Sequence, residues 1–350
     1  MKANRRKLLL GALALAAFPA GAGRARQRRS GGYLDRDDVR AFVDEVAEAQ
    51  ALPRPWLEKV LASGRHSAAA ERLMTPALTP PPRDWRRYRE RVLDDSRLRD
   101  GRAFLQRHEA VLARAQEDFG VPPQIVAAII GIETHYGRVM GTFRTLDVLL
   151  TLAFDYPRRA AFYRDELAQF LSLGHRGQLD VLRQTGSFAG AIGLPQFMPS
   201  SIARYGLDYD GDGRIDLARS EADAIGSVGR YLQQQGWQRD HPIAFDAVAN
   251  EAIMDEVGRG IVAERTWTSV AELGVRIDGT LDPEARVVLM DLPYRLDDAA
   301  EGVVYRLGTV NMAAILHYNR SYFYGAAVTE LAAELRGRDA PAAATASARS

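Results

Sequence analysis

The segment PPQIVAAIIGIETHY, from Pro122 to Tyr136, decides the fold of this chain. Its two prolines stand where prolines are tolerated, in the first turn of a helix. At about 100° per residue, the side chains of Val126, Ile129 and Ile130 fall within roughly 60° of Glu133. The segment therefore predicts a buried helix with one carboxylate in the middle of its apolar face.

A carboxylate in that position loses contact with water, which favours its neutral form and raises its pKa. Glu133 would then hold a proton near neutral pH, as a general acid requires. On the helix alone, the commoner arrangement is a buried glutamate paired with an arginine, such as Arg138 or Arg158. The rest of the sequence has to decide between the two.

The composition excludes several classes of protein. The 350 residues suffice for a substantial core and for two or three lobes. The chain has no cysteine, which excludes disulfides, thiolate metal sites, a cysteine nucleophile and an acylated N-terminal cysteine. The sequence motifs of serine hydrolases, P-loop proteins and dinucleotide-binding folds are missing as well. We therefore expect no cofactor for catalysis.

The N-terminus has the pattern of an export signal. Four basic residues precede the apolar run from Leu8 to Phe18, and Ala20-Gly21-Ala22 supplies small residues for cleavage. Because the run is too short to span a membrane, we expect residues 1–22 to be a signal peptide and the mature protein to be periplasmic, without a stable membrane anchor. Arg5-Arg6 is also compatible with twin-arginine export.

Cleavage would change the charge balance of the chain. Residues 1–22 contain four basic and no acidic residues, so their removal changes the formal net charge from +1 to −3. A mildly acidic protein lacks the basic surface of nucleic-acid binding proteins. We therefore exclude nucleic acid as a partner.

Helical patterns dominate the chain, and β-type runs are confined to one region. Apolar residues recur at helical spacing between 35 and 62 and between 100 and 235, and four prolines between Thr75 and Arg83 predict an extended strap. Short β-type runs at 286–290 and 303–307 indicate a small α+β lobe, after which helix returns at 309–336. The predicted organisation is a signal peptide (1–22), a linker (23–34), an N-terminal α region (35–100), a helical core (101–239 and 308–336), an α+β lobe (240–307) and a disordered tail (337–350).

A glycine-rich segment, GSFAGAIGLPQFMPSS at 186–201, is a candidate ligand site. Its three glycines allow the backbone to approach a ligand closely. Ser187 and Gln196 are uncharged hydrogen-bonding residues, and Phe197 and Met198 offer apolar contacts. This combination suits a sugar ring with acetamido groups, although a packed turn without a ligand fits the segment equally well.

The loop from Asp208 to Asp216 matches an EF-hand at positions 1, 3, 5, 6, 8 and 9. Asp208, Asp210 and Asp212 would coordinate a structural Ca²⁺ or Na⁺, together with the carbonyl of Arg214. Position 12 is Arg219, where an EF-hand supplies a bidentate glutamate, so a later carboxylate such as Glu221 or Asp223 has to complete the site. The alternative is an acidic turn with bulk counterions.

Two further stretches carry side chains that suit a glycopeptide. Residues 318–324 read YNRSYFY, in which tyrosine faces can pack against sugar rings and Asn319 can bind an acetamido group; a core helix with a tyrosine stripe is the alternative. Arg158 and Arg159 are either a solvated pair or a clamp for peptide-stem carboxylates.

Taken together, these stretches resemble the lytic murein transglycosylases of the B type. The resemblance runs from about residue 35 to residue 336 and keeps one order of motifs. It rests on 120–141, Tyr156-Pro157-Arg158-Arg159, the glycine-rich segment, the acidic loop, Asp223 to Val228 and Tyr318 to Ser321.

The resemblance implies a mainly α (α+β) fold, with a lysozyme-like helical catalytic core, an additional α domain and a small β-containing lobe. It implies that Glu133 is the catalytic acid/base and that peptidoglycan glycan strands are the substrate. It also implies that Asp223 completes the metal site, although Asp223 lies one residue further from Asp208 than the pattern predicts. The positions that line the saccharide groove by this match are Ser187, Gln196, Tyr231, Tyr318, Asn319 and Tyr324.

Two rival functions remain at this point. A lysozyme-like hydrolase normally uses a second carboxylate, and Asp147, Asp155 and Asp165 are candidates that lie in no motif. A non-catalytic wall-binding protein with a calcium site is the other rival. The sequence favours a lytic transglycosylase, which cleaves the bond between N-acetylmuramic acid and N-acetylglucosamine without water and leaves 1,6-anhydromuramoyl ends.

Overall fold

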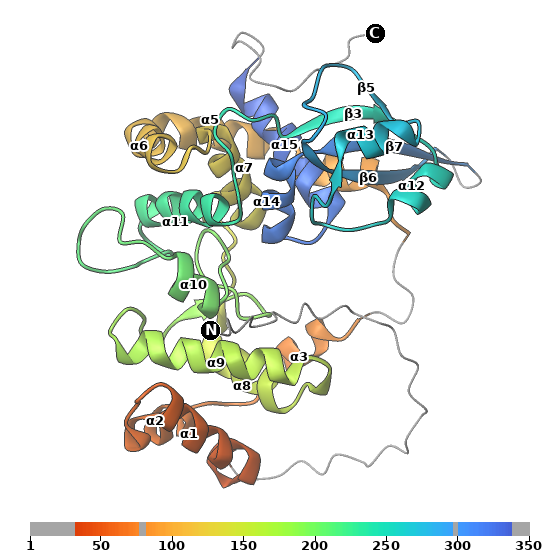
Figure 1. Cartoon of the computed structure of the whole chain (residues 1–350). Helices are drawn as coiled ribbons and strands as arrows, with labels where there is room; N and C mark the ends of the chain where they lie inside the picture. The colour runs from red at the N-terminus through yellow and green to blue at the C-terminus, as the bar shows by residue number, and fades with distance from the viewer. Residues whose placement is uncertain (1–31, 77–81, 297–299, 338–350) are drawn as a thin grey trace, which may run out of the picture. The chain divides into compact units, whose positions relative to one another are not determined.

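The computed structural model describes residues 32–76, 82–296 and 300–337, which lie within one compact unit that begins at Gly32. This part of the chain is mainly helical with a small antiparallel sheet (Figure 1), which confirms the predicted fold class. The predicted signal peptide, most of the linker, the middle of the proline strap and the C-terminal tail lie outside the described residues.

Helices occupy both ranges in which the apolar spacing predicts them, and further helices lie between these ranges. In the N-terminal half they are η1 (Tyr33–Asp35), α1 (Asp37–Ala49), α2 (Arg54–Ala62), α3 (Ala68–Met74), α4 (Trp85–Val92), α5 (Asp95–Arg107), α6 (Glu109–Phe119) and α7 (Pro123–Thr134). They continue with α8 (Thr145–Phe154), η2 (Pro157–Arg159), α9 (Ala160–His175), α10 (Pro199–Tyr205) and α11 (Glu221–Gln234). Strands β1 (Phe143–Arg144) and β2 (Thr185–Gly186) form a short antiparallel pair at the start of the glycine-rich segment.

The β-type runs form the predicted small lobe. Its five-stranded sheet has the order β4-β6-β7-β3-β5, and all its neighbouring strands are antiparallel. The strands are β3 (Ala244–Val248), β4 (Arg265–Thr266), β5 (Arg276–Ile277), β6 (Arg286–Arg295) and β7 (Glu301–Gly308), with helices α12 (Glu251–Val257) and α13 (Trp267–Glu272) between them. The long hairpin β6–β7 pairs Val288 with Gly308 and Arg295 with Glu301, and it leads the chain directly back into the helical core.

The helical segment predicted for 309–336 is interrupted in the structure. The structure has α14 (Val310–Tyr318) and α15 (Tyr322–Arg336) instead. Asn319 and Ser321 are in extended conformation, and the Ser321 hydroxyl accepts a hydrogen bond from the Tyr324 amide as the N-cap of α15. A serine that competes for backbone amides favours such a break over helix continuation. The break leaves Asn319 exposed between the two helices.

Helix α7 occupies the centre of the helical core. It contacts α15, α5, α11 and α6, and every side chain from Ile125 to Ile130 is 1% exposed or less. Burial on several sides explains why the helix is apolar over most of its circumference. The predicted helix is therefore confirmed, with both ends inside the predicted range.

Two hydrophobic cores meet at the end of α7. One core joins α1 and α2 to the helices around α7, and the other joins the sheet to α4 and to parts of α14 and α15. Ile132 packs against both cores. Helix α4, which the sequence places in the N-terminal α region, thus shares its core with the small lobe. Glu133, the next residue, lies at the junction.

Candidate active site

Glu133 is partly exposed, but its carboxyl group is enclosed by the helices around α7. Burial raises its pKa to about 7, and a hydrogen-bonding interaction with Tyr324 lowers it by less. No basic residue contributes to this pKa among the described residues. Arg138, one candidate for an ion pair with Glu133, binds Asp100 instead at 2.7 Å. Within the described chain, Glu133 is therefore an enclosed carboxylate that is proton-bound below about pH 7, as the sequence predicts.

Three tyrosines surround the Glu133 carboxylate. Its charge raises the pKa values of Tyr88, Tyr318 and Tyr324, after the larger effect of burial on each phenol. The Tyr324 hydroxyl approaches Glu133, yet it forms no hydrogen bond of good geometry with another described group. Such a hydroxyl can turn to the carboxylate when it becomes anionic, because an ionised acceptor forms the stronger bond.

The end of α7 is fixed by a strained turn. His135 and Tyr136 both have positive φ, 51° and 56°, a conformation that costs free energy in residues other than glycine. The Tyr136 ring fits against Gly131 of α7 and Gly101 of α5, where an added Cβ would lie 2.5 Å and 2.3 Å from its hydroxyl. The His135 ring contacts Asp100 at 2.8 Å. These contacts hold the end of α7 in place, and with it the backbone that carries the Glu133 side chain.

Thr134 ties this helix end to the glycine-rich segment. Its buried hydroxyl donates to the carbonyl of Leu194 at 3.0 Å and accepts from the amide of Gly137 at 3.1 Å. Tyr318 donates to the carbonyl of Pro195. The neighbouring carbonyls of Leu194 and Pro195 are thus held by Thr134, which follows Glu133 in the sequence, and by Tyr318, whose pKa responds to the charge of Glu133.

The predicted polar ligands of the segment also shape its backbone. The Ser187 hydroxyl accepts from the amides of Ala189 and Ala191 at 3.3 and 3.1 Å. The Gln196 side-chain amide donates to the carbonyls of Gly193 and Met140 at 2.9 and 3.3 Å. Ser187 keeps a hydroxyl proton and Gln196 keeps a side-chain carbonyl, so both can still bind a sugar.

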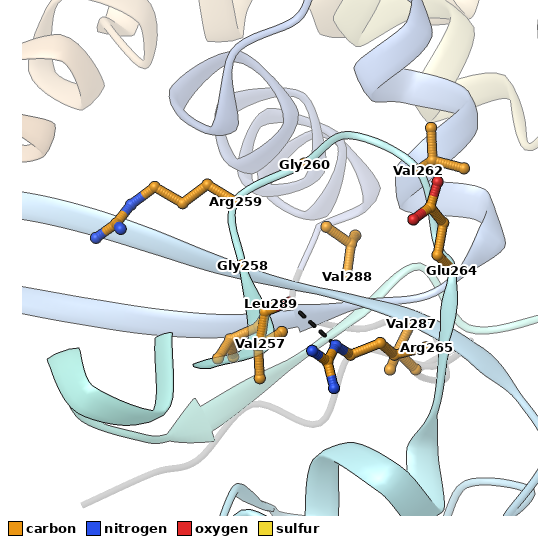
Figure 2. A pocket seen from close by; sticks show the side chains of 10 residues that line it. All are labelled: Val257, Gly258, Arg259, Gly260, Val262, Glu264, Arg265, Val287, Val288 and Leu289. Carbon is orange, nitrogen blue, oxygen red and sulfur yellow. Dashed lines mark hydrogen bonds between the residues drawn. The ribbon is translucent and has the colours of Figure 1, made fainter. Parts of the chain in front are cut away.

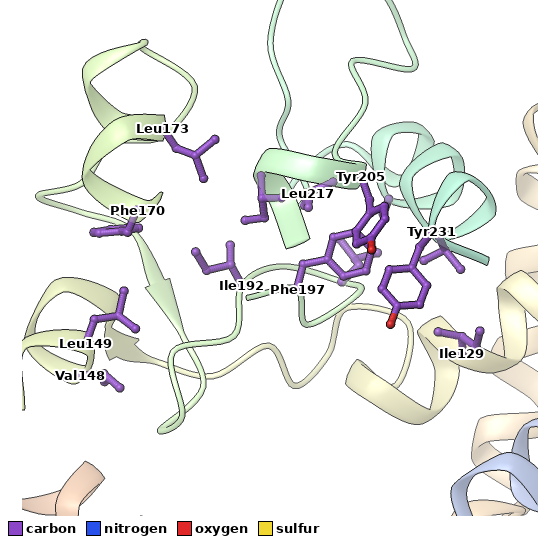
Figure 3. Close-up of a cluster of buried hydrophobic side chains, with 14 of the residues drawn as sticks. Ile129, Val148, Leu149, Phe170, Leu173, Ile192, Phe197, Tyr205, Leu217 and Tyr231 are labelled. Atoms are coloured by element: carbon purple, nitrogen blue, oxygen red, sulfur yellow. The ribbon is translucent and has the colours of Figure 1, made fainter. Parts of the chain in front are cut away.

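Phe197 and the tyrosines that pack against it form an aromatic wall, and Phe197, Tyr205 and Tyr231 are drawn in Figure 3. Phe197 packs against Tyr205 of α10, Tyr231 of α11 and Tyr318, with ring centroids 6.4, 5.6 and 5.8 Å apart. Phe197 is only 2% exposed, so it supports the tyrosines from behind and offers little surface to a ligand itself. Met198 is partly buried beside it.

Arg158 and Arg159 lie on another element, η2, and both are exposed. The Arg159 guanidinium is 4.2 Å from the ring centre of Phe162 on α9. Its charge lowers the pKa of Glu166, for which burial is the larger and opposite effect. Arg159 is therefore placed toward α9 and α10, and the described contacts do not join it to Glu133.

Sequence reasoning missed three residues of this site. Tyr88 lies in a basic helix without a motif, and the sequence pattern assigns no role to Thr134 or Tyr205. Only the apolar spacing of Trp85 and Tyr88 on one side of α4 distinguished Tyr88, and that spacing is common. Contacts across the fold identify all three.

The acidic loop brings three of its predicted ligands together. One carboxylate oxygen each from Asp208, Asp210 and Asp212 lies within 4.8 Å of the others. Asp223 is not part of this group: its two oxygens accept hydrogen bonds from the amides of Tyr209, Asp210 and Asp216, at 2.7, 3.3 and 2.8 Å. The exposed Arg214 follows Asp212 in the loop and donates its amide to Asp212 at 2.9 Å.

A separate cavity of about 230 Å³ lies in the small lobe, between β6 and the loop from Val257 to Arg265 (Figure 2). Its two arginines already have partners. Arg265 donates to the carbonyls of Val257 and Glu256, and Arg259 pairs with Asp255 and Asp291. The cavity contains none of the groups around Glu133, so we do not regard it as the active site.

Comparison with known proteins agrees with this geometry. Residues 35–333 match the family model of the transglycosylase SLT domain. The chain is 34% identical over 309 residues to the membrane-bound lytic murein transglycosylase B of Escherichia coli, with 86% of this chain and 83% of the relative covered. The solved structure of soluble lytic transglycosylase SltB1 from Pseudomonas aeruginosa is similar, with 37% identity, a TM-score of 0.79 and coverage of 87% of this chain and 100% of that chain. The lytic transglycosylase Slt35 of Escherichia coli, solved in complex with calcium, has 34% identity, a TM-score of 0.76 and coverage of 87% and 95%.

The chain therefore belongs to the transglycosylase SLT family. It is a peptidoglycan lytic transglycosylase, a lyase that acts on the murein of the cell wall. The resemblance read from its motifs is confirmed.

The enclosure of Glu133 predicts a pH-dependent stability. A folded-state pKa of about 7 lies above the value of about 4.3 in an unfolded chain, so the native state binds the extra proton between these values. The contribution of this group to the free energy of unfolding is complete below about pH 4 and is lost as the pH rises to about 7, by roughly 4 kcal/mol at most. The variant Glu133→Gln should therefore gain stability relative to the wild type over this range in urea titrations.

The variant Glu109→Gln, on the exposed side of α6, controls for the loss of a negative charge. A Glu133→Gln difference that stays constant from pH 4.5 to pH 7.5 would contradict the proton-bound state.

Proposed function

We propose that Glu133 is the single catalytic acid and base of this transglycosylase. The observation that carries the proposal is a lone enclosed carboxyl group with a pKa of about 7, since a catalytic group works best when its pKa lies near the working pH. No second carboxylate contributes to this pKa in the described chain. A hydrolytic pair at the separations that glycosidases use would make such a contribution.

The three aspartates that a hydrolase could use as a second carboxylate have other partners or are exposed. Asp147 accepts from Arg144 and from the Arg65 amide, each at 2.9 Å. Asp155 pairs with Arg36 at 2.8 Å, and Asp165 is exposed on α9. These positions support a reaction without a second carboxylate.

In the first step, protonated Glu133 donates its proton to the oxygen between N-acetylmuramic acid and N-acetylglucosamine. The bond from C1 of the muramoyl residue to this oxygen breaks, the bonding electrons leave with the oxygen, and positive charge develops at C1. The carbonyl oxygen of the substrate's own 2-acetamido group stabilises that carbon, as in substrate-assisted glycosidases.

In the second step, the Glu133 carboxylate removes the proton from the 6-hydroxyl of the same sugar. The hydroxyl oxygen bonds to C1, the acetamido oxygen is released, and a 1,6-anhydro ring forms. Glu133 returns to its protonated state, so one residue serves both steps and no water is consumed. The Tyr324 hydroxyl, which lowers the pKa of Glu133, stabilises the carboxylate between the steps.

The remaining predicted residues would bind the glycan. We assign the orientation of the acetamido group to Ser187 and the exposed Asn319, and contacts with sugar rings to Tyr231, Tyr318 and Met198. Gln196 would hold the backbone of the glycine-rich segment, and Phe197 would support the tyrosines from behind. Tyr324 would stabilise the Glu133 carboxylate. Arg158 and Arg159 would bind stem-peptide carboxylates at the rim.

The products test the proposed chemistry. Digestion of purified peptidoglycan should give muropeptides with 1,6-anhydromuramoyl ends, each lighter by one water than the products of a hydrolase. The variant Glu133→Gln should lower the rate by roughly 10³-fold and still sediment with insoluble peptidoglycan. Mass spectrometry of the soluble fragments and a pull-down measure the two effects.

Asp165→Asn, which changes an exposed carboxylate, is the matched control and should retain activity. Reducing-end products from the wild type, or turnover by Glu133→Gln near the wild-type rate, would overturn the proposed role of Glu133.

We further propose that the acidic loop binds a structural Ca²⁺ or Na⁺. Three carboxylates with oxygens within 4.8 Å provide the hard oxygen ligands that Ca²⁺ prefers, and the calcium complex of the relative Slt35 supports the proposal. Asp208, Asp210, Asp212 and the Arg214 carbonyl would hold the ion. Asp223 would hold the loop itself, because its oxygens already accept three backbone amides.

Calcium should therefore stabilise the fold without taking part in the chemistry. Saturating Ca²⁺ should raise the melting temperature by roughly 5 °C relative to the protein in EDTA. Asp212→Ala should abolish this difference and lower the melting temperature in EDTA less than Asp223→Ala does, because it removes one backbone contact and not three. Asp223→Ala should lower the melting temperature in EDTA as well, since it removes a clamp of the loop. Differential scanning fluorimetry measures the wild type and both variants with Ca²⁺ and with EDTA, and equal values in the two conditions for the wild type would exclude a cation site.

We propose a periplasmic location, with peptidoglycan strands as the partner. The described residues contain no helix that is both long enough and apolar enough to cross a membrane. The N-terminal motif supports export, with removal of residues 1–22 and no stable membrane anchor. Intact-mass analysis of protein from a periplasmic extract should show a chain that begins at Gly23, whereas an unprocessed chain in the membrane fraction would contradict the proposal.

A further inference from the structure

The first turn of α15 contains three consecutive aromatic residues, Tyr322, Phe323 and Tyr324, directly after the break that follows α14. Successive side chains of a helix point about 100° apart, so the three rings face three different parts of the fold. Tyr324 faces Glu133, as described above. The mechanism uses Tyr324 and assigns nothing to the other two rings.

The hydroxyl of Tyr322 forms two hydrogen bonds with one residue of the small lobe. It donates to the carbonyl of Gly260 at 2.7 Å and accepts from the Gly260 amide at 2.9 Å. Gly260 lies in the loop between α12 and β4 that borders the cavity of the small lobe (Figure 2). Tyr322 and Tyr324 are two positions apart, so they point to nearly opposite sides of the helix. One side of this turn is therefore anchored in the small lobe, and the other carries the tyrosine next to the acid.

The loop that binds this hydroxyl is itself fixed. Arg265 donates to the carbonyls of Val257 and Glu256 at 3.0 and 2.8 Å, which closes the loop at its two ends. Arg259, beside the anchoring glycine, pairs with Asp291 of β6 at 3.4 Å. The amide and the carbonyl that bind the phenol are thus held in place by the sheet and by α12.

Phe323 connects the same turn to α4. Its ring centroid lies 5.6 Å from those of Trp85 and Tyr88. Tyr88 is one of the tyrosines whose pKa is raised by the charge of Glu133. The first turn of α15 therefore contacts the small lobe, α4 and the acid at the same time.

The backbone gives this turn little support of its own. The first amides of a helix have no partner within the helix, and the Ser321 hydroxyl accepts from the Tyr324 amide only at 3.4 Å. Because Asn319 and Ser321 are extended, α14 does not hold α15 as one continuous helix. Side-chain contacts must therefore fix the start of α15, and with it the position of Tyr324.

We propose that Tyr322 is a positioning residue for the reaction, and that the small lobe holds Tyr324 at Glu133 through the bonds between Tyr322 and Gly260. The inference rests on the proposed function, because it takes Glu133 as the acid and Tyr324 as the donor that stabilises its carboxylate. It gives the small lobe a part in the reaction without contact with the reacting atoms.

The surroundings of Glu133 and of Tyr322 contain different charged groups. The charge of Glu133 acts on the phenols of Tyr88, Tyr318 and Tyr324, and within the described chain no charged residue of α5, α6 or α11 contributes to the pKa of Glu133. The charged residues that act on the phenol of Tyr322 are Asp291, Arg259 and Arg83. Tyr322 itself does not contribute to the pKa of Glu133. A Tyr322 variant can therefore change the titration of Glu133 only through a change of position.

The variant Tyr322→Phe removes both hydrogen bonds and keeps the ring. On soluble glycan strands, kcat should fall by about 3- to 10-fold, which corresponds to the loss of one hydrogen bond at the acid. KM should change less than about 2-fold, because Tyr322 binds the small lobe and not the substrate. Glu133 must be protonated for the first step, so kcat/KM falls as the pH rises through its pKa of about 7. Since Tyr324 lowers this pKa, a displaced Tyr324 should move the fall to higher pH.

A double-mutant cycle tests whether Tyr322 acts through Tyr324. Tyr324→Phe should move the pH profile in the same direction, and the double variant Tyr322→Phe with Tyr324→Phe should move it no further, because both changes remove one contact. Tyr305→Phe is the matched control, since it removes from β7 a hydroxyl that forms no hydrogen bond within the described chain. Gly260→Ala keeps both backbone groups, and its added Cβ meets no atom within 4 Å. Both controls should behave like the wild type.

The assays are run below the lowest melting temperature of these variants, so that each enzyme is folded. A Tyr322→Phe enzyme with the kcat and the pH profile of the wild type would overturn the proposal, and so would additive shifts in the double variant. Failure of the proposed function gives a different result, namely hydrolytic ends from the wild type or turnover by Glu133→Gln. Anhydro ends and a required Glu133, together with an unchanged Tyr322→Phe enzyme, would refute the positioning role alone.

Discussion

The desolvation of one carboxyl group is the interaction on which this structure depends. Glu133 belongs to a helix whose other side chains are almost entirely buried, and it lies where the core of the helical region meets the core of the small lobe. Enclosure there raises its pKa to about 7. A charged group at this point destabilises the fold, so the protein maintains a proton-bound acid at the cost of stability. Such a compromise is expected at a functional site.

The surroundings of Glu133 hold the acid still and leave it a way to ionise. The strained residues His135 and Tyr136 and the buried hydroxyl of Thr134 fix the end of α7 against α5 and the glycine-rich segment. The Tyr324 hydroxyl remains available to the carboxylate. Rigid placement reduces the reorganisation that a reaction requires, and one adjustable donor accommodates the change of charge.

The hydrogen bonds around the glycine-rich segment show which polar side chains hold its backbone. Residues that look like ligand-binding groups in the sequence, such as Gln196 and Tyr318, use donors to hold the backbone of the glycine-rich segment. Phe197 supports the tyrosine wall from behind. In the acidic loop Asp223 organises the backbone, and the three exposed aspartates that face one another also accept amides of the loop. In both places polar side chains hold the backbone of the site in position.

The sequence by itself determined the helix around Glu133, the helical character of the chain, the small sheet and the family. Apolar spacing, glycine-rich turns and acidic loops are local signals, and local signals survive without knowledge of the fold. It could not predict the break between α14 and α15, because a capping hydrogen bond from Ser321 competes with helix propensity only in context. The sequence did not identify Tyr88, Thr134 and Tyr205 for another reason: their roles come from interactions with Glu133, Leu194 and Tyr231, which lie 45, 60 and 26 positions away. Only the tertiary structure decided that Glu133 has no arginine partner in the described chain, because an ion pair depends on distance in space and not on spacing in sequence.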